Sequence, residues 1–379
     1  MGKKRHVVHM TTVHHPYDPR IYYKQCLSLH EAGYEVTLIS QTTDEPNEMD
    51  MPIRHIPVKK YTSRLKRMIF GTWDAYKKAK QQNADIYVFH DPELLFVASL
   101  LKKRNNIVVY DIHEDYITSI LQKDYLKKPI KKIIATCYTV IEKLFTRKME
   151  KSLAEKYYQD AYPNGVCILN YPLLNEKMQQ LDRDQQQPTN NLLYTGNVTE
   201  ERGALIHATL PKIDSDTNVQ FIGKCPSRLA EQMKEVAGKE APHLHFEGID
   251  TFVVKERIEE MYMQERWLAG IALFPPTEHY MKKELTKFFE YMNAGLPIIC
   301  SNFPVWQEFI DRYECGIAVD PYDKTAIKQA IRTLRDNPNL AYQMGENGRR
   351  AVVEELNWNV EKGKLLRWYD ELIRERANK

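Results

Sequence analysis

The chain has 379 residues, of which 43% are hydrophobic and 28% are charged, and these fractions exclude a disordered or fibrous protein. The length exceeds one typical domain and fits two. No apolar run approaches the ~18 residues that a membrane-spanning helix needs, and Met1 to His6 lead straight into a short strand, so no secretory leader is expected. The six cysteines form no C-x-x-C pair, which indicates free thiols in a reducing compartment.

The net charge of +3 hides an asymmetry between the two halves of the chain. Residues 1–170 carry 27 Lys and Arg against 19 Asp and Glu, whereas the remainder carries 27 against 32. A basic first half beside an acidic second half suggests that one lobe meets an anionic surface.

The first half alternates short apolar strands with helical patterns. Strands are expected at 6–10, 36–40, 86–90 and 107–112, and helices at 20–32 and 92–104. This β-α-β order predicts an α/β domain with a parallel sheet covered on both faces. Ligands of such sheets bind at the carboxyl ends of the strands. The polar groups that follow strands in this half are Tyr17, Asp18, Arg20, His90, Asp91, His113 and Glu114.

The second half repeats the β-α plan after a polar segment, 173–190, whose glutamines and Pro188 indicate a linker. Its strands are expected at 192–195, 219–222, 244–246, 269–274 and 298–300, and its helices at 204–210, 227–236 and 286–294, followed by a mostly helical tail over 323–376. The predicted domains are therefore 1–172 and 191–355, with a final helical segment, 356–379.

The stretch 286–305 carries the most specific chemistry. It reads as a helix with Thr286 as N-cap and Gly295 as its stop, followed after Pro297 by a buried strand. The N-terminus of a helix suits a phosphate, and Lys287 adds a cation at that end. Glu290, one turn further on, could accept hydrogen bonds from ribose hydroxyls. An ordinary helix-strand unit with a solvated Glu290 is the alternative.

The string K-F-F-E-Y-M-N-A-G-L-P over 287–297 closely resembles the donor-site motif of family 4 glycosyltransferases. The resemblance extends along nearly the whole chain. It implies a GT-B fold, in which two Rossmann-like domains face each other across a cleft, and a retaining reaction. It also implies that the final helix crosses back to the first domain. Relatives carry a strand within 147–155, but this chain is expected to run there from helix into helix.

The resemblance assigns further roles residue by residue. Arg202 and Gly196 match a phosphate-binding motif in which Asn197 replaces a usual arginine, and His113 matches a histidine that contacts the donor sugar. Lys282 stands where relatives have a first glutamate. Backbone N–H groups of Glu284, Leu285 and Thr286 would serve the sugar and phosphate, and Gly248 and Ile249 would cradle the nucleobase. Acceptor or cleft contacts are Tyr17, Asp18, Arg20, His90, Asp91 and Glu114. The bland alternatives are a solvated Arg202, a structural His113 and an exposed Arg20 at a helix start.

The predicted function is transfer of a sugar from a nucleotide sugar to an acceptor hydroxyl, in cell-surface glycan or glycolipid synthesis, by a glycosyltransferase (EC 2.4) with His113, Arg202, Lys287 and Glu290 as catalytic residues. No cofactor or metal is expected, because no Asp-x-Asp cluster suited to Mg²⁺ or Mn²⁺ occurs in the donor region. The alternatives are a nucleotide-sugar epimerase or hydrolase of the same fold, and a non-catalytic sugar-nucleotide-binding protein.

The expected partners are a nucleotide-sugar donor and a sugar or lipid-linked acceptor, without nucleic acid. Residues 123–156 hold ten Lys and Arg against four Asp and Glu among apolar residues, which indicates peripheral contact with an anionic membrane. A core-facing helix with a solvated basic side is the alternative. The expected location is the cytoplasm, on the inner face of the cell membrane if that contact forms.

Overall fold

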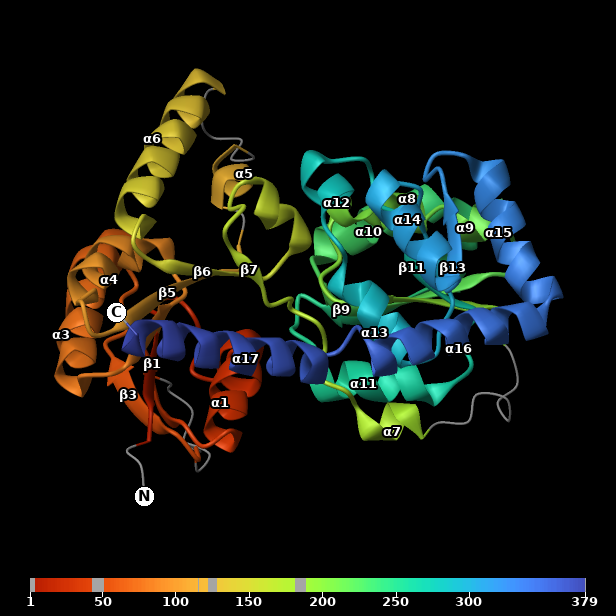
Figure 1. Ribbon diagram of the computed structural model, residues 1–379. Coiled ribbons are helices and arrows are strands. Elements are labelled where there is room, and N and C mark those ends of the chain that lie inside the picture. Colours follow the sequence, from red (N-terminus) through yellow and green to blue (C-terminus); the bar gives the residue numbers. More distant parts are fainter. Residues whose placement is uncertain (1–3, 43–50, 115, 122–127, 181–188, 379) are drawn as a thin grey trace. The chain divides into compact units, whose positions relative to one another are not determined.

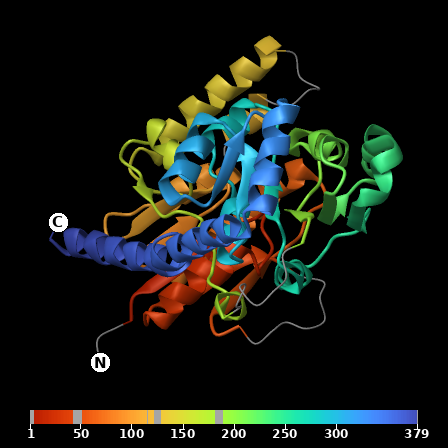
Figure 2. The same ribbon diagram turned by 90° about the vertical axis from the view of Figure 1, so that its right-hand side faces the viewer.

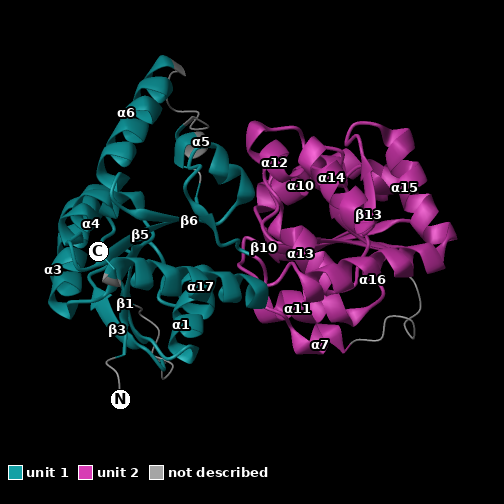
Figure 3. Cartoon of the chain, in the orientation of Figure 1, with its two compact units in different colours: residues 1–170, 358–379 teal, residues 171–357 magenta. Residues whose placement is uncertain are grey.

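The computed structural model describes residues 4–42, 51–114, 116–121, 128–180 and 189–378. The chain divides into two compact units, shown in Figure 3. Unit 1 comprises Met1–Asn170 and Trp358–Lys379, and unit 2 comprises Tyr171–Asn357. The expected linker, 173–190, therefore belongs to unit 2, where 176–179 form a short helix, and its residues 181–188 lie outside the described part.

Unit 1 is built on a parallel sheet of seven strands, in the order β3-β2-β1-β4-β5-β6-β7. The strands are β1 (His6–Met10), β2 (Glu35–Gln41), β3 (Arg54–Val58), β4 (Ile86–Phe89), β5 (Ile107–Ile112), β6 (Glu150–Leu153) and β7 (Val166–Cys167). The chain reverses its direction of travel across the sheet between β1 and β4, so the carboxyl ends of these strands form the switch point where α/β proteins bind ligands.

Side chains of each strand alternate between two apolar layers, as strand geometry requires. Val8 and Met10 of β1 face one core layer, whereas Val7 faces the other. The helical segments of this part of the unit are η1 (Pro19–Cys26), α1 (Leu27–Glu31), α2 (Arg64–Lys66), η2 (Arg67–Gly71), α3 (Thr72–Gln82), η3 (Pro92–Leu94), α4 (Leu95–Leu101), α5 (Tyr116–Leu121), α6 (Lys128–Thr146) and η4 (Lys156–Asp160). Helices α3 and α4 pack on the first layer, and η1 with α1 packs on the second.

The second layer is completed from the far end of the sequence by α17 (Trp358–Ala377), which runs beside α1 in Figures 1 and 2. Trp358, Leu365 and Tyr369 are buried in the same core as β1, β2, β4 and β5. The Trp358 indole N–H donates a buried hydrogen bond to Ser28 Oγ at 2.9 Å. The final helix is thus part of the first unit's core.

The structure corrects two expectations in unit 1. The prediction that 147–155 lacks a strand is wrong, because Glu150–Leu153 form β6 between β5 and β7. Leu153 is the one apolar side chain of β6. The segment forms a strand because its backbone pairs with β5 and β7, not because of an apolar sequence pattern. The helix expected over 20–32 begins instead as a π-helical segment, η1, and becomes α-helical only at Leu27.

Unit 2 carries a second parallel sheet, of six strands in the order β10-β9-β8-β11-β12-β13. The strands are β8 (Asn191–Thr195), β9 (Asn218–Cys225), β10 (Leu244–Ile249), β11 (Ala269–Ala272), β12 (Ile298–Ser301) and β13 (Gly316–Val319). The helical segments are α7 (Glu176–Gln179), η5 (Glu200–Arg202), α8 (Ala204–His207), α9 (Leu210–Ile213), α10 (Ser227–Ala237), η6 (Gly238–His243), α11 (Lys255–Gln264), α12 (Glu278–Lys282), α13 (Thr286–Asn293), α14 (Pro304–Tyr313), α15 (Lys324–Asp336) and α16 (Pro338–Glu354). Its switch point lies between β8 and β11.

Each unit thus has a Rossmann-like parallel sheet with helices on both faces. None of the described helices combines the length and the apolar content needed to cross a bilayer.

Replacing Trp358 by Ala should lower the unfolding free energy of unit 1 by about 3–5 kcal/mol, because it empties a fully packed indole site and removes a buried hydrogen bond. Chemical denaturation of the full chain would measure this. Trp73→Ala is the matched control, since its side chain is 43% exposed, and it should cost about 1 kcal/mol or less. Equal losses in the two variants would contradict the role of α17.

Candidate active site

In unit 2, a glycine-containing turn follows β8 at the switch point. Gly196 has φ +83° and Gly203 has φ +76°, a left-handed conformation that suits glycine. A Cβ on Gly203 would lie 1.9 Å from the carbonyl oxygen of Leu273, just beyond β11. The turn can therefore approach the end of β11 only without a side chain at position 203.

Lys287, in the first turn of α13, is buried below this turn. Its ammonium donates a hydrogen bond to the carbonyl oxygen of Thr195, the last residue of β8. The same Nζ lies 4.4 Å from the centroid of the Tyr194 ring, a cation–π arrangement. Burial and the nearby Arg202 charge lower the pKa of Lys287 to about 7, although Glu290 opposes the shift. Nearby negative charge is thus insufficient to stabilise the ammonium form of Lys287, and an anionic ligand would supply it.

Arg202 is the second cation of this region. It ends η5, and its Nε donates a hydrogen bond to the hydroxyl of Tyr280, in α12, at 3.1 Å. His207, one helical turn later, is fully buried and accepts a hydrogen bond from the Leu273 backbone N–H at 2.9 Å. Burial and the Lys287 charge lower the pKa of His207 to about 3, so this histidine is neutral and adds no charge.

Glu290 is half-buried in α13, four residues after Thr286. It accepts a hydrogen bond at 3.1 Å from the hydroxyl of Tyr262, which also lies 2.8 Å from Thr195 Oγ1. The carboxylate is therefore oriented by a buried tyrosine close to the end of β8.

The entry to α13 differs from the expectation. The N-cap residue is Leu285, whereas Thr286 is the first helical residue and is exposed, so the prediction of Thr286 as N-cap is wrong. No side chain caps this helix. Among the preceding residues Lys282 is exposed, and Glu284 is half-buried.

The loop expected to hold a nucleobase borders a hollow of about 340 Å³. Gly248, with φ +110°, and Ile249 line it together with Phe252, whose side chain is 74% exposed. The hollow lies at the carboxyl end of β10, on the same edge of the sheet as the Gly196 turn.

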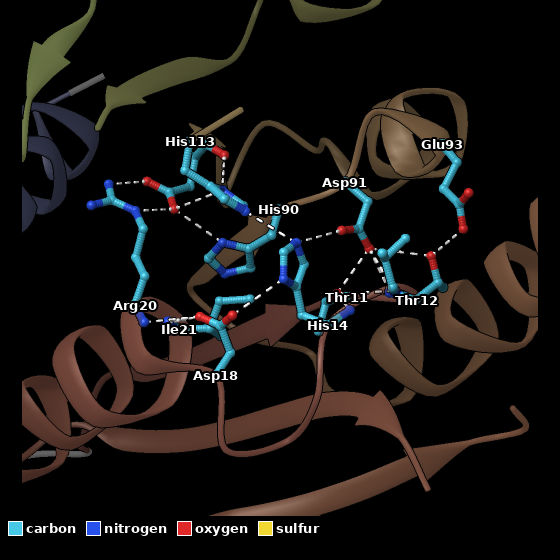
Figure 4. A network of polar contacts seen from close by, with 12 residues as sticks. Thr11, Thr12, His14, Asp18, Arg20, Ile21, His90, Asp91, Glu93 and His113 are labelled. Carbon is cyan, nitrogen blue, oxygen red and sulfur yellow. Dashed lines mark hydrogen bonds and ion pairs between the residues drawn. The ribbon is translucent and has the colours of Figure 1, made fainter. Parts of the chain in front are cut away.

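In unit 1, a buried carboxylate organises the switch point (Figure 4). Asp111, at the end of β5, accepts two hydrogen bonds from Arg20: one from Nε at 2.9 Å and one from an Nη at 2.7 Å. The Gln25 amide and His90 Nδ1 also contact this carboxylate, at 3.0 and 3.1 Å. Burial alone would raise the pKa of Asp111, but the Arg20 charge and the hydrogen bonds from His113, His90 and Arg20 hold it well below its usual range.

Arg20 is 3% exposed, so the exposed arginine considered as the alternative is wrong. Its guanidinium also donates to the Ile168 carbonyl at 2.9 Å. These partners give Arg20 a structural role.

Four histidines surround Asp111. His90 is buried and stacks on His9, with His9 Nδ1 3.0 Å from His90 Nε2. Burial lowers the pKa of both rings. His113, after β5, and His14, after β1, meet through their Nε2 atoms at 3.1 Å.

The remaining predicted residues of unit 1 lie around these rings. Asp91 is buried, and one of its oxygens accepts hydrogen bonds from the Thr11 hydroxyl at 2.9 Å and from the Thr12 backbone N–H. Asp18 caps η1 by accepting hydrogen bonds from two backbone N–H groups, and its carboxylate also contacts His14. Burial alone would raise the pKa of Asp18, but these contacts outweigh it and lower the pKa to about 2. Tyr17 is half-buried, and Glu114 is exposed.

Comparisons with known proteins bear on this arrangement. Residues 252–351, within unit 2, match the family model "Glycosyl transferases group 1". Among solved structures, a sucrose-phosphate synthase from Thermosynechococcus elongatus aligns at a TM-score of 0.74 and 16% identity, covering 98% of this chain and 100% of that one. The fold is therefore GT-B. A search of curated protein sequences found no match.

Two further structures support this assignment of the fold. A glycosyltransferase from Rickettsia africae ESF-5 aligns at a TM-score of 0.71 and 15% identity, covering 98% of this chain and 99% of that one. Anabaena Alr3699/HepE, solved in complex with UDP and glucose, aligns at 0.68 and 10%, covering 97% and 100%. The part of the chain that matches the family model contains Lys282, Lys287 and Glu290, whereas Arg202 precedes it.

The sequence analysis missed the residues that hold these groups in place. Tyr262 and Tyr280, which bind Glu290 and Arg202, come from helices distant in the sequence. His14 could have been predicted as a site residue, because it follows an apolar strand in the same way as His90 and His113.

Replacing Asp111 by Asn should destabilise unit 1 by about 3–5 kcal/mol at pH 7, since it leaves the Arg20 charge buried without its counter-ion. Asp111 has a lowered pKa when folded, so it contributes stability above its unfolded pKa of ~3.9 that is lost as the pH falls. The difference between wild type and variant should therefore shrink as the pH falls through about 4 and below. Denaturant titration at several pH values tests this.

Asp74→Asn is the control for this measurement. Its pair with Lys78 is partly exposed, so the change should cost about 0.5 kcal/mol or less. If Asp111→Asn lowered the unfolding free energy by no more than Asp74→Asn does, the central role assigned to Asp111 would be contradicted.

Proposed function

We propose that the protein is a glycosyltransferase that moves a sugar from a nucleoside-diphosphate sugar to an acceptor hydroxyl with retention of the anomeric configuration, as in family 4. The observation that carries the proposal is the buried, charge-deficient Lys287 beside Arg202 at the switch point of unit 2. Two neighbouring cations lie in a desolvated place where the Glu290 carboxylate does not restore the ordinary pKa of Lys287, and this favours an anionic ligand.

A nucleotide diphosphate satisfies this site in full. Its phosphates would pair with Arg202 and Lys287 and approach the turn at Gly196, beside which the Lys287 ammonium lies. The first N–H groups of α13 add a partial positive charge. As the sugar–phosphate bond breaks, the same groups stabilise the charge that develops on the leaving diphosphate, so that no metal at the diphosphate is required.

Glu290 supports the nucleotide half of the ligand. Tyr262 fixes one of its oxygens, and the carboxylate can accept hydrogen bonds from the two ribose hydroxyls. The base would occupy the hollow beside Gly248 and Ile249, where the exposed Phe252 ring offers a stacking surface. Backbone N–H groups near Glu284 and Leu285 would bind the sugar.

The comparisons support the choice of donor. Anabaena Alr3699/HepE was solved with UDP-glucose, and several aligned proteins are named as glycosyltransferases or sugar-phosphate synthases. A nucleotide sugar is therefore the proposed donor, and a sugar or lipid-linked hydroxyl the proposed acceptor, in cell-surface glycan or glycolipid synthesis. An epimerase or hydrolase would use the same donor contacts but would form product without an acceptor.

The ribose and phosphate assignments can be separated by binding measurements. From UDP, GDP, ADP and CDP, the tightest ligand would be compared with its 2′-deoxy analogue by calorimetry. In the wild type the deoxy analogue should bind at least about tenfold more weakly, and Glu290→Gln should abolish this difference because the hydroxyl then loses its charged acceptor. Arg202→Ala should weaken the diphosphate at least about tenfold but leave the parent nucleoside unaffected.

Turnover provides the second readout. With a working donor and acceptor, Arg202→Ala and Glu290→Ala should each lower kcat/KM by about 100-fold or more. The exposed Arg228 and Glu231 of α10 supply matched controls, Arg228→Ala and Glu231→Ala. No binding of any of the four nucleotides to the wild type, or unchanged affinities in the Arg202 and Glu290 variants, would overturn the proposal.

Lys287 predicts a pH dependence of donor binding. Its lowered pKa of about 7 in the free protein means that it is largely neutral at pH 8, whereas a bound diphosphate favours the ammonium form. Binding should therefore take up a proton, and affinity should fall as the pH rises above about 7. Calorimetry at pH 8 in two buffers of different ionisation enthalpy measures the uptake. Lys287→Met should abolish it, whereas Lys324→Met, at an exposed position, should not.

We also propose that unit 1 contacts an anionic membrane through α6. At about 3.6 residues per turn, the exposed apolar residues of this helix fall on one face: Ile130, Ile133, Ile134, Val140, Ile141 and Leu144. They form one stripe along the helix, with Lys132 and Lys143 exposed beside it. The core-facing alternative does not account for this stripe, because Glu142 and Tyr138 lie on the buried side instead. Tyr125 and Leu126, counted with this stretch from the sequence, lie outside the described residues.

A paired substitution tests the membrane contact. Ile133→Asp with Leu144→Asp should reduce co-sedimentation with vesicles of phosphatidylcholine and phosphatidylglycerol at least about tenfold, because it places charge in the stripe. Tyr322→Asp, which changes a side chain of unit 2 that is 62% exposed, is the control. Wild-type binding that is absent, or equal with and without the anionic lipid, would contradict the proposal.

A further inference from the structure

The imidazoles of His14 and His113 face each other in an arrangement that the proposed transfer does not explain. Their Nε2 atoms lie 3.1 Å apart, and the ring planes are inclined by 57° (Figure 4). His14 leaves the end of β1, and His113 leaves the end of β5, so both are fixed by central strands of the sheet. Both side chains are partly buried, with 15% of His14 and 11% of His113 exposed.

The opposite side of each ring is held by an oxygen atom that can only accept. His14 Nδ1 lies 3.2 Å from a carboxylate oxygen of Asp18. His113 Nδ1 lies 3.2 Å from the backbone carbonyl oxygen of Asp111. Each Nδ1 therefore carries a hydrogen, and in a neutral ring the Nε2 atom has a free lone pair. Two lone pairs directed at each other at 3.1 Å require a positive species to stabilise them.

The surroundings of this pair are rich in negative charge. Asp91 Oδ1 lies 3.4 Å from His14 Nε2, and this oxygen is buried without a hydrogen-bond donor. Glu114 adds a second carboxylate and Asp18 a third. A divalent cation would offset more of this charge than a single proton.

We propose that His14 Nε2, His113 Nε2 and a carboxylate oxygen of Glu114 bind a divalent transition-metal ion of the zinc class. One donor atom from each of the three residues lies within 4.8 Å of the other two. Two nitrogens bound to one tetrahedral zinc ion are separated by roughly 3.3 Å, close to the 3.1 Å between the two rings. Two histidines with one carboxylate are a common zinc set and leave a fourth position for water or a ligand.

The second layer of contacts matches that of metal-binding histidines, which usually donate the other ring N–H to a carboxylate or a backbone carbonyl. Asp18 holds His14 in this way, and the Asp111 carbonyl holds His113. Tyr116 hydrogen-bonds Glu114, and burial and this carboxylate raise the pKa of the tyrosine. The other triple of this region, His90, Asp111 and His113, is less suitable, since Arg20 already occupies the Asp111 carboxylate.

This site is separate from the donor contacts of unit 2. No metal was expected from the sequence, on the ground that the donor region has no Asp-x-Asp cluster; the site proposed here lies in unit 1 and has two imidazole ligands. The metal would fix both rings at the carboxyl edge of the unit 1 sheet, and the fourth position would bind an oxygen or nitrogen of a small ligand.

The test uses the full chain without a histidine tag, stripped of metal by a chelator. Titration with Co²⁺, followed by its visible absorption, and with Zn²⁺, followed by calorimetry, should show one tight equivalent per chain. Because protons compete for the two Nε2 atoms, affinity should fall as the pH is lowered from about 7.5 to 5.5. His14→Gln and His113→Gln should each weaken binding at least about tenfold.

The control is His15→Gln, which changes the neighbouring exposed histidine and should leave the affinity within about twofold. Circular dichroism of each variant excludes unfolding as the cause of a loss. Absence of binding to the wild type, or equal binding by the His14, His113 and His15 variants, would overturn the proposal and leave a shared proton between the rings. Nucleotides are omitted, so failure here is distinct from failure of the proposed transferase function.

Discussion

The arrangement of unit 1 depends on the buried ion pair between Asp111 and Arg20. A carboxylate without exposure is tolerated only when its charge is paired and its oxygens are hydrogen-bonded, and Arg20, Gln25 and His90 meet both conditions. These partners come from η1 and from the end of β4, so one carboxylate ties two other parts of the chain to the end of β5. The backbone carbonyl of the same residue also orients His113. Without this ion pair, the loops that carry His14, His90 and His113 would no longer be held in fixed positions by one residue.

The two switch points have opposite electrostatic character. In unit 2, Lys287 and Arg202 lie together with too little negative charge, and the pKa of the lysine falls accordingly. In unit 1, Asp18, Asp91 and Glu114 surround His14 with too little positive charge, and its pKa rises. Both imbalances lie where parallel sheets bind ligands. One is suited to an anion and the other to a cation, which is how two copies of a similar architecture can serve different chemistry.

Much of the fold followed from apolar periodicity. The bounds of β1 and β5 agree with the predicted ranges, because each is a buried run with clear ends. Strand β6 was missed because three of its four residues are polar or charged, and pairing with β5 and β7 rather than its own pattern makes it a strand. The π-helical η1 was also out of reach, since no residue pattern distinguishes it from an α-helix.

The candidate site was predictable where a motif stood on one segment. Glu290 and Lys287 share a short helix, so their proximity to one another could be predicted from the sequence. The contact of Lys287 with Thr195 joins residues 92 positions apart, and that of Arg20 with Asp111 joins residues 91 positions apart. Both contacts require the folded sheet. The chemistry of a single side chain could be named from the sequence, but its protonation could not, because desolvation depends on neighbours from distant elements.

The return of α17 into the core of unit 1 has a consequence for how the polypeptide matures. Residues 171–357 interrupt the first unit, so core side chains such as Trp358 and Tyr369 leave the ribosome only after all of unit 2 has been synthesised. The second unit can finish its own core earlier, from a contiguous segment. During translation, the sheet of unit 1 therefore has one apolar face uncovered until α17 is synthesised. In this interval the nascent chain would be most prone to aggregate or to bind chaperones.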